Sequence, residues 1–189
     1  MIILVDLDSV SFSPLETNRK LFESEHIFIH VFSFAFECMS LGRFCAVPEF
    51  QLPYHRRVSG GGVVFHGPRR DISFAFSFYA HSINLRDTFL FISQMISEFI
   101  KSGFGFSSYI RGTDVYFNNH KICGFAAARR RNFFVIEGCI SLQFNDSKKN
   151  NIKNPQNFCF LNFGEEIENF HEISFNLIKF MMKNLREFI

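Results

Sequence analysis

The stretch Arg56–His66 constrains this chain more than any other, and it reads Arg-Arg-Val-Ser-Gly-Gly-Gly-Val-Val-Phe-His. Glycine loses the most backbone freedom on folding, about 0.5–1 kcal/mol relative to alanine inside a regular element. Three consecutive glycines therefore favour a backbone that adopts positive φ or that a ligand approaches without Cβ atoms in between. Exposed N–H groups in such a turn form an anion-binding nest, which neighbouring arginines strengthen. The stretch predicts either an anion-binding loop or a glycine-rich hairpin turn.

A second segment, residues 114–124, reads Asp-Val-Tyr-Phe-Asn-Asn-His-Lys-Ile-Cys-Gly. An apolar strand pattern stops at a turn, and a single lysine, Lys121, opens the next strand. Together the two segments resemble the lipoate–protein ligase branch of the biotin/lipoate ligase family. That branch carries Arg-Arg-x-Ser-Gly-Gly-Gly-x-Val-(Phe/Tyr)-His and, downstream, Asn-Asp-(Leu/Val), a turn and Lys-(Ile/Val)-x-Gly. The resemblance covers about residues 40–145.

The resemblance implies a role for each matching residue. Lys121 would be the catalytic residue, contacting the carboxylate of the acid and then the acyl-phosphate oxygens, where a fixed ammonium stabilises developing charge. Asp114 would contact Mg²⁺ or the nucleotide, although Thr113 stands where the family has asparagine. The other substrate- and nucleotide-binding residues that the resemblance implies are Arg56, Arg57, Ser59, Gly60, Gly61, Gly62, His66, Ile122 and Gly124.

The implied reaction is the ATP-dependent activation of lipoate, or of octanoate, to an acyl-adenylate, with Mg²⁺ as cofactor. Transfer to a lysine of a lipoyl domain would follow. The implied acceptors are the acyltransferase subunits of 2-oxoacid dehydrogenases and the glycine cleavage H protein. The chain stops about where larger ligases add a C-terminal accessory domain, so a separate accessory protein or an inactive relative is a further expectation.

Two segments depart from the family pattern. The family's histidine is usually followed by Asp-x-Gly-Asn, whereas His66 is followed by Gly-Pro-Arg-Arg-Asp. The His-His-Gly often found on the strand after the lysine motif is replaced by residues 136–138, Ile-Glu-Gly.

Other enzyme classes with the same fold remain alternatives. His66-Gly67-Pro68 is similar to the end of an octanoyltransferase motif, and Cys159 stands about where such enzymes place the cysteine that forms an acyl thioester. The flanking Phe158 and Phe160 favour a buried structural thiol instead. A biotin ligase is a poorer match because its Gly-Arg-Gly-Arg loop is absent.

A nucleic-acid-binding module is the third class that the sequence raises. Basic runs occur at residues 69–70, 129–131 and 148–149, and such runs can bind phosphate backbones. The formal net charge is only +2, however, so we expect these runs to be solvated turns and the chain to have no nucleic-acid partner.

Length and composition favour a soluble globular protein. The 189 residues suit one domain spanning 1–189, and 47% of them are hydrophobic and 20% charged. No basic N-terminal leader or apolar run long enough for a bilayer is found. The five cysteines form no Cys-x-x-Cys pair. We therefore expect free thiols, a cytoplasmic location and no membrane partner.

The fold class predicted is α+β, a biotin/lipoate ligase-like mixed sheet backed by helices, in a single domain without the accessory domain. Ser13 is expected to cap the first helix, with Pro14 in its first turn. Residues 72–79 alternate phenylalanine or isoleucine with serine or alanine, and the small face would either admit an acyl chain or receive a helix. The predicted strands are 2–5, 27–36 (covered on both faces), 63–66 paired with 72–79, 114–118, 121–128 and 133–144. The predicted helices are 13–24, 86–101 (ended by Gly103 and Gly105) and 165–186, with a surface loop at 147–156.

Overall fold

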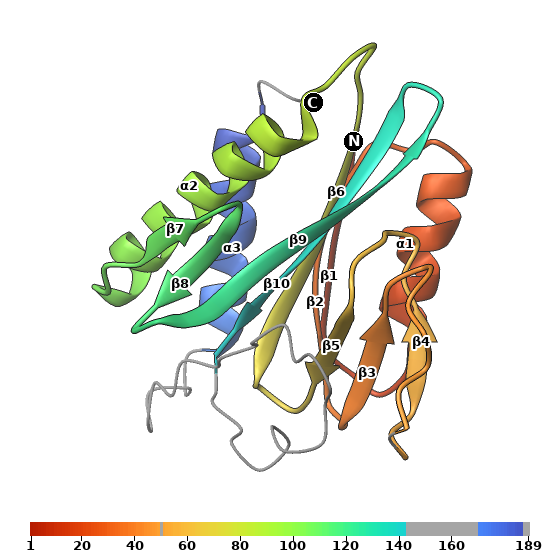
Figure 1. Ribbon diagram of the computed structural model, residues 1–189, viewed down its shortest axis with the longest axis horizontal. Helices are drawn as coiled ribbons and strands as arrows, with labels where there is room; N and C mark the ends of the chain where they lie inside the picture. Colours follow the sequence, from red (N-terminus) through yellow and green to blue (C-terminus); the bar gives the residue numbers. More distant parts are fainter. Residues whose placement is uncertain (50, 143–169, 187–189) are drawn as a thin grey trace.

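The computed structural model describes residues 1–49, 51–142 and 170–186 (Figure 1). It confirms the predicted fold class, because a large mixed sheet is backed by helices. In chain order the elements are β1 (Ile2–Ser9), α1 (Ser13–Glu23), β2 (Phe28–Phe34), β3 (Cys38–Leu41), β4 (Tyr54–Arg56), β5 (Val63–His66), β6 (Asp71–Tyr79), α2 (Leu85–Phe104), β7 (Tyr109–Arg111), β8 (Asp114–Phe117), β9 (His120–Arg130), β10 (Phe133–Ser141) and α3 (Phe170–Asn184).

Two sheets organise the described residues. The larger has seven strands in the order β1-β2-β6-β10-β9-β8-β7, and the smaller has three in the order β4-β3-β5. The β1–β2 pair is parallel and the other neighbours in the large sheet are antiparallel. In Figure 1, α2 and α3 lie on one side of the large sheet, and α1 and the small sheet lie on the other.

The main core forms where α2 and α3 pack on the large sheet. The phenylalanine and isoleucine side chains of β6 belong to it, together with the apolar stripes of both helices. Ala75, one of the small residues that alternate with them, points to the opposite face, where it packs with Phe22 of α1 and with Val58. Burial on both faces explains why every residue of β2 is buried, as predicted from its apolar run.

The helices match the sequence pattern closely, with differences at their ends. Pro14 is in the first turn of α1, but Phe12 is the N-cap residue and no side-chain cap bond forms. The prediction of Ser13 as the cap is therefore wrong, because Ser13 is already helical and its hydroxyl lies 3.3 Å from that of Ser9. In α2, Gly105 is the C-cap with φ +72°, whereas Gly103 lies within the helix.

The predicted pairing of residues 63–66 with 72–79 is also wrong. Both segments are strands, but β5 pairs with β3 in the small sheet and β6 pairs with β2 and β10 in the large one. The connection Gly67–Arg70 includes Arg69 at φ +52° and carries the chain from one sheet to the other. The sequence predicted that one strand ends and another begins here, but the turn residues do not indicate which neighbouring strand each of the two pairs with.

Several predictions fall on residues outside the described part of the chain. These are the last two residues of the strand predicted at 133–144, the loop at 147–156 with the basic run 148–149, Cys159, and the first turns expected for the C-terminal helix. Within the described residues, no helix combines the length and apolar character that crossing a membrane requires.

Candidate functional site

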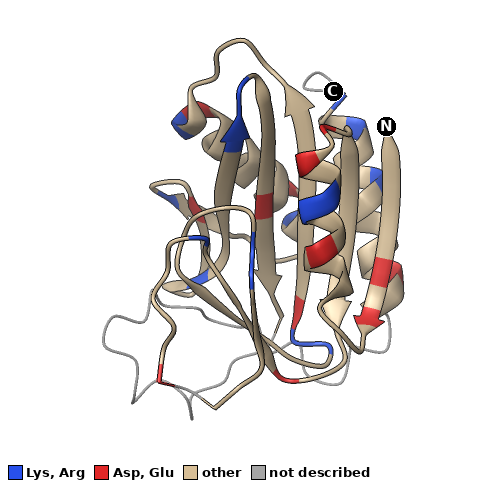
Figure 2. Ribbon diagram, turned by 90° about the vertical axis from the view of Figure 1, so that its right-hand side faces the viewer, with Lys and Arg blue, Asp and Glu red and all other residues tan. Residues whose placement is uncertain are grey.

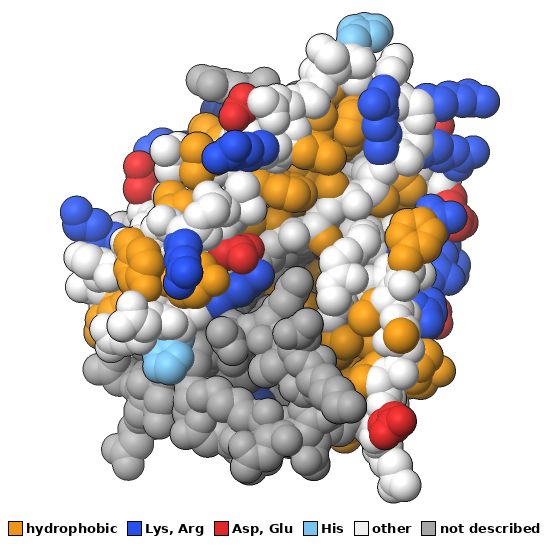
Figure 3. Space-filling model, viewed as in Figure 1, with side chains coloured by type: hydrophobic (Ala, Val, Ile, Leu, Met, Phe, Trp, Pro, Cys, Tyr) orange, Lys and Arg blue, Asp and Glu red, His pale blue; other side chains and the backbone are white. Residues whose placement is uncertain are grey.

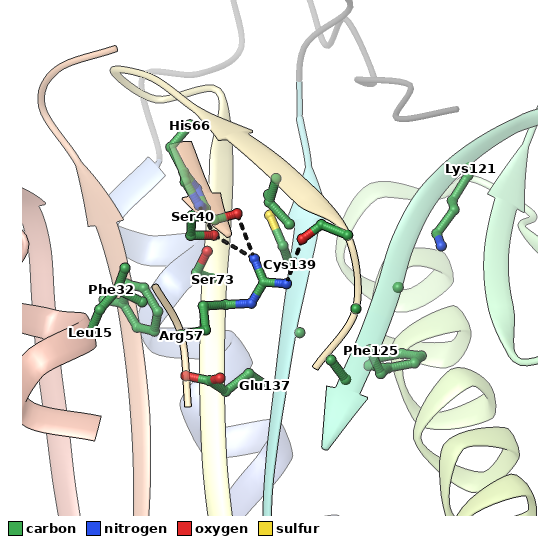
Figure 4. A pocket seen from close by; sticks show the side chains of 16 residues that line it. Leu15, Phe32, Ser40, Arg57, His66, Ser73, Lys121, Phe125, Glu137 and Cys139 are labelled. Carbon is green, nitrogen blue, oxygen red and sulfur yellow. Dashed lines mark hydrogen bonds between the residues drawn. The ribbon is translucent and has the colours of Figure 1, made fainter. Parts of the chain in front are cut away.

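A pocket lies where the small sheet meets β9 and β10 of the large one (Figure 4). Lys121 approaches it from one side, Arg57 and His66 from the other, and Glu137 and Cys139 from the strand between them (Figure 4). Figure 3 shows hydrophobic side chains in the middle of the molecular face seen in Figure 1, with charged side chains around them. The residues that line the pocket are Leu15, Phe32, Ser40, Arg57, Gly61, Gly62, Val64, His66, Ser73, Lys121, Gly124, Phe125, Ala126, Glu137, Gly138 and Cys139.

The glycine-rich loop is held by two neighbouring segments. Gly42 donates its N–H to the carbonyl of Gly62, and a Cβ at Gly42 would lie 2.0 Å from the carbonyl oxygen of Gly61. On the other side, Gly60 donates to the carbonyl of Ala127 on β9. Gly61 has φ +84°, so the loop needs glycine there for its left-handed backbone, and it needs Gly42 for the close approach of the neighbouring segment. Within the described residues, the N–H groups of Gly61 and Gly62 donate no hydrogen bond, as an anion-binding turn requires.

Both arginines of the motif are engaged with the backbone. Arg57 is buried and donates to the carbonyls of Ser40, Gly60 and Gly62 and to the Ser40 hydroxyl, over 2.7–3.1 Å. Burial lowers the pKa of Arg57, and the charge of Glu137 opposes that shift. Arg56 lies outside the pocket lining and donates to the carbonyl of Cys45 at 2.7 Å. The guanidinium of Arg57 thus fixes the shape of the loop while adding positive charge to the pocket wall.

Lys121 and Asp114 form an ion pair whose Nζ–Oδ2 distance is 2.7 Å. The Lys121 side chain is 11% exposed and lies over Gly124, three residues along β9. A Cβ at Gly124 would stand 2.5 Å from Lys121 Cε and 2.7 Å from its Nζ. The Lys-x-x-Gly spacing therefore has a steric cause, because only glycine leaves room for the folded-back ammonium.

Glu137 joins the glycine loop to helix α1 through a buried polar chain. Its Oε2 accepts hydrogen bonds from the N–H and the hydroxyl of Ser59, and its Oε1 accepts from the amide of Asn18. The Oδ1 of Asn18 lies 2.8 Å from Nδ1 of His30. Burial lowers the pKa of His30 to about 4, so this imidazole is neutral at physiological pH. Glu137 occupies a position where the family often has histidine, and here it anchors the loop.

His66 is held at both ring nitrogens. Its Nδ1 lies 2.7 Å from Oδ2 of Asp71, and its Nε2 lies 2.7 Å from the hydroxyl of Ser40. The same Asp71 oxygen accepts from the hydroxyl of Ser73 at 3.2 Å and from the thiol of Cys139 at 3.4 Å. The His66 ring is thus oriented by the carboxylate of Asp71, and its Nε2 faces the hydroxyl of Ser40 in the pocket. A histidine that only packs in a core does not need both of these partners.

His66, Asp71 and Cys139 also form a group that could hold a metal ion among the described residues, since one ligand atom of each lies within 4.8 Å of the others. A metal would need the thiolate. Burial and the charge of Asp71 raise the pKa of Cys139 well above its ordinary value, and the three groups bond to one another, with the Cys139 thiol and Nδ1 of His66 both at Asp71 Oδ2. The same burial makes Cys139 a poor acyl-accepting nucleophile.

Asp114 does not belong to a preformed Mg²⁺ site among the described residues. Its carboxylate is ion-paired with Lys121, and no group of three potential ligands among the described residues includes it. Mg²⁺ commonly binds through one or two carboxylates together with substrate phosphates. Asp114 can therefore contribute to a magnesium–nucleotide complex only alongside phosphate oxygens.

The structure brings six of the predicted site residues into the pocket wall: Arg57, Gly61, Gly62, His66, Lys121 and Gly124. Three others support this wall from behind: Ser59 and Gly60 hold the loop, and Asp114 pairs with Lys121. The side chain of Ile122 packs in the main core. Sequence reasoning missed Ser40, Asp71 and Glu137 as site residues. Ser40 lies in no recognised motif, whereas Asp71 and Glu137 lie in the two segments that depart from the family pattern. The small face of β6 was a usable signal for Ser73.

The basic run 129–131 lies at the turn between β9 and β10. Arg130 donates to the carbonyl of Glu23 and lies 3.7 Å from the carboxylate of Glu25, while Arg129 contacts the ring of Phe134. In Figure 2, acidic and basic residues are interspersed along the ribbon. Arg129 and Arg130 therefore have contacts within the protein, as expected for residues beside a turn.

Comparisons with known proteins agree with this geometry. The family model of the lipoyl protein ligase A/B catalytic domain matches residues 40–169. A search of curated protein sequences finds no match.

Solved structures share the fold at low sequence identity. LipL1 of P. falciparum in complex with lipoate is 16% identical, with TM-score 0.72 over 98% of this chain and 62% of its own. A lipoate-protein ligase A bound with ATP is 16% identical, with TM-score 0.76 over 97% and 84%. The bi-partite lipoate protein ligase from Thermoplasma acidophilum, studied with its E2 lipoyl domain, is 16% identical, with TM-score 0.78 over 97% and 83%. The chain thus spans less than two thirds of the P. falciparum protein and more than four fifths of the other two.

Proposed function

Since this chain belongs to the lipoyl protein ligase A/B catalytic-domain family, we propose that it activates lipoate, or octanoate, with ATP and transfers the acyl group to a lysine of a lipoyl domain. The observation that carries the proposal is the pocket that joins the Arg-Arg-x-Ser-Gly-Gly-Gly loop to the Lys-x-x-Gly strand. Relatives of the same fold have been solved with lipoate and with ATP, which supports these substrates here.

The acyl chain would lie along the apolar part of the pocket wall. Leu15, Phe32 and Phe125 line the pocket, and burying apolar surface stabilises a bound chain by about 25 cal/mol per Å². The carboxylate would then point towards Lys121. The carboxylate attacks the α-phosphate of ATP, forming the acyl-adenylate and releasing pyrophosphate.

Lys121 and the loop N–H groups would stabilise the charge that develops in this step. The ammonium of Lys121 is fixed by Asp114 and by the space above Gly124, so it need not reorganise as the reaction proceeds. Gly61 and Gly62 offer donors that no described residue uses. Magnesium would arrive as the ATP complex, with Asp114 as a partner of the phosphate-bound ion.

Transfer would follow when an acceptor lysine attacks the acyl carbonyl and AMP leaves. The T. acidophilum ligase was studied with its E2 lipoyl domain, and we propose lipoyl domains, including those of 2-oxoacid dehydrogenase subunits and the glycine cleavage H protein, as acceptors here. Holding both reactants in one pocket supplies the proximity that a two-step transfer needs.

The variant Lys121→Met tests the activation step. Removing a fixed cation from the site of charge development costs about 100-fold or more in rate. Lipoate-dependent exchange of labelled pyrophosphate into ATP should fall by that factor, whereas the matched variant Lys101→Met, at an exposed helix lysine, should exchange at the wild-type rate. Full exchange by a folded Lys121→Met protein would contradict the proposed role.

A further inference from the structure

Three side chains at the junction of the two sheets form a continuous hydrogen-bonded chain: Ser40 on β3, His66 at the end of β5 and Asp71 at the start of β6. The Ser40 Oγ–His66 Nε2 and His66 Nδ1–Asp71 Oδ2 distances are both 2.7 Å. Ser40 and His66 line the pocket, and Figure 4 shows the Ser40 hydroxyl between His66 and Arg57. The activation step proposed above assigns no proton transfer to these side chains.

The partners fix where the protons lie. The carboxylate of Asp71 accepts from the backbone N–H of Gly67 and from the hydroxyl of Ser73, so it also accepts from Nδ1–H of His66. With its proton on Nδ1, the imidazole has Nε2 as its acceptor atom. Arg57 can only donate, and it donates to the Ser40 oxygen at 2.8 Å. The single proton of the Ser40 hydroxyl is therefore directed at Nε2 of His66.

This arrangement meets the geometric requirements of a Ser-His-Asp acyl-transfer site. A hydroxyl is hydrogen-bonded to a base, the base is oriented by a buried carboxylate, and all distances fall in the range of 2.6–3.2 Å that such sites need. A cation stands 2.8 Å from the attacking oxygen, next to the carbon on which an oxyanion would form. The N–H groups of Gly61 and Gly62, which bond to no described residue, belong to the same pocket wall.

We propose that Ser40, His66 and Asp71 form a second catalytic device, which cleaves thioesters or activated esters of medium-chain acids without ATP. Ser40 Oγ bonds to the acyl carbonyl carbon, the bond from that carbon to the leaving sulfur or oxygen breaks, and His66 passes the serine proton to the leaving group. Water then attacks the Ser40 ester, giving its proton to His66, and the free acid leaves as Ser40 recovers its proton. The net reaction is hydrolysis of the acyl donor.

The pocket defines the substrate class. Ser40 is 1% exposed, so an acyl donor reaches it through the pocket, whose lining includes the apolar side chains Phe32 and Val64 beside Ser40 and His66. A slender chain fits such a wall. If the proposed ligase function holds, the acid released here is of the class that the adenylation step consumes.

The test is acylation of the full chain by p-nitrophenyl octanoate in the absence of ATP. The proposal predicts a burst of p-nitrophenol and a single octanoyl adduct that peptide mapping places on Ser40. Asp71→Asn, which reverses the tautomer preference of His66, should slow the burst by about a thousandfold or more. Ser40→Ala should abolish both burst and adduct.

Ser33→Ala is the matched control, because Ser33 is a buried strand serine that accepts the N–H of Asp8 and lies outside the pocket lining. It should react like the wild type. An adduct on another residue of the wild-type protein, or release of p-nitrophenol no faster than in buffer, would overturn the proposal, whatever the stability of the variants. ATP-dependent lipoylation is measured separately, so either activity can fail without the other.

Discussion

At the scale of single residues, the position of the Lys121 ammonium is set by its neighbours on β8 and β9. Asp114 binds it at 2.7 Å, and Gly124 supplies the space into which the side chain folds back. Because the aliphatic stem of lysine is flexible, the fold can tolerate its displacement, but a reaction that depends on a fixed cation cannot.

Gly124→Ala should therefore separate activity from stability. The added Cβ would meet Lys121 Nζ at 2.7 Å, so the ammonium must move. We expect lipoate-dependent pyrophosphate exchange to fall by about 10- to 100-fold, with the free energy of unfolding changed by less than about 1 kcal/mol. Gly103→Ala is the control, since that helix glycine faces open space and should keep full activity. Equal exchange rates in both variants would refute the positioning role of Gly124.

At the scale of elements, β9 connects the two motifs. It carries Lys121 and Gly124, and its small residues let the glycine loop lie against the strand, where Gly60 bonds to Ala127. The loop is held on its other side by Gly42. Its conformation thus depends on two other segments, one before it and one after it in the sequence.

Gly42→Ala tests that dependence. The new Cβ would meet the backbone carbonyl oxygens of Gly61 and Gly60, at 2.0 and 2.6 Å. Backbone must shift, so we expect the free energy of unfolding to fall by about 1–3 kcal/mol and lipoate binding to weaken. Urea denaturation and isothermal titration with lipoate measure the two effects. Gly60→Ala is the control for stability, because nothing lies within 4 Å of its added Cβ. If Gly60→Ala lowered the free energy of unfolding as much as Gly42→Ala, the steric explanation would be disproved.

The buried chain from α1 to β10 predicts a pH dependence of stability. The folded-state pKa of His30 is about 4, below the value of 6.5 for an unperturbed histidine, because the ring is buried. Between these values the unfolded state binds a proton that the folded state does not, so stability falls as the pH falls from 6.5 towards 4. The contribution is on the order of 3 kcal/mol.

Urea unfolding at pH 7, 6 and 5 checks this expectation. The fall in the free energy of unfolding should be smaller in His30→Gln than in the wild type, and the exposed-site variant His26→Gln should behave like the wild type. The same pH slope in His30→Gln and wild type would rule out His30 as its source.

At the scale of the whole molecule, the site lies where two sheets meet, and this explains what the sequence could predict. The apolar periodicity of residues 86–101 predicted α2, and the alternation in 72–79 predicted the strand β6. The alternation did not show that α2 and α3 pack on the phenylalanine face of β6, because a helix was considered only for the small face. The short strands β3 and β4, of four and three residues, were missed because so few residues cannot show an alternation of apolar and polar side chains. The partner of β5 was wrong because pairing is decided by the tertiary contact with β3.

The residues of the candidate site also divide into those that the sequence predicted and those that it did not. The glycine loop and Lys121 were recognisable because their chemistry is local in sequence. Ser40 and Glu137 come to the site from the small sheet and from β10, and their hydrogen-bond partners could be identified only from the fold. A motif records backbone conformation and charge along one segment, but it does not record which distant side chain completes a hydrogen bond.

The most direct test of the central claim is the intact mass of an apo lipoyl domain after incubation with this protein, lipoate, ATP and magnesium. We predict a mass gain of one lipoyl group on the acceptor that requires ATP and is lost with Lys121→Met. A gain that appears only with an octanoyl thioester donor and without ATP, or no gain from either donor, would contradict an ATP-dependent ligase.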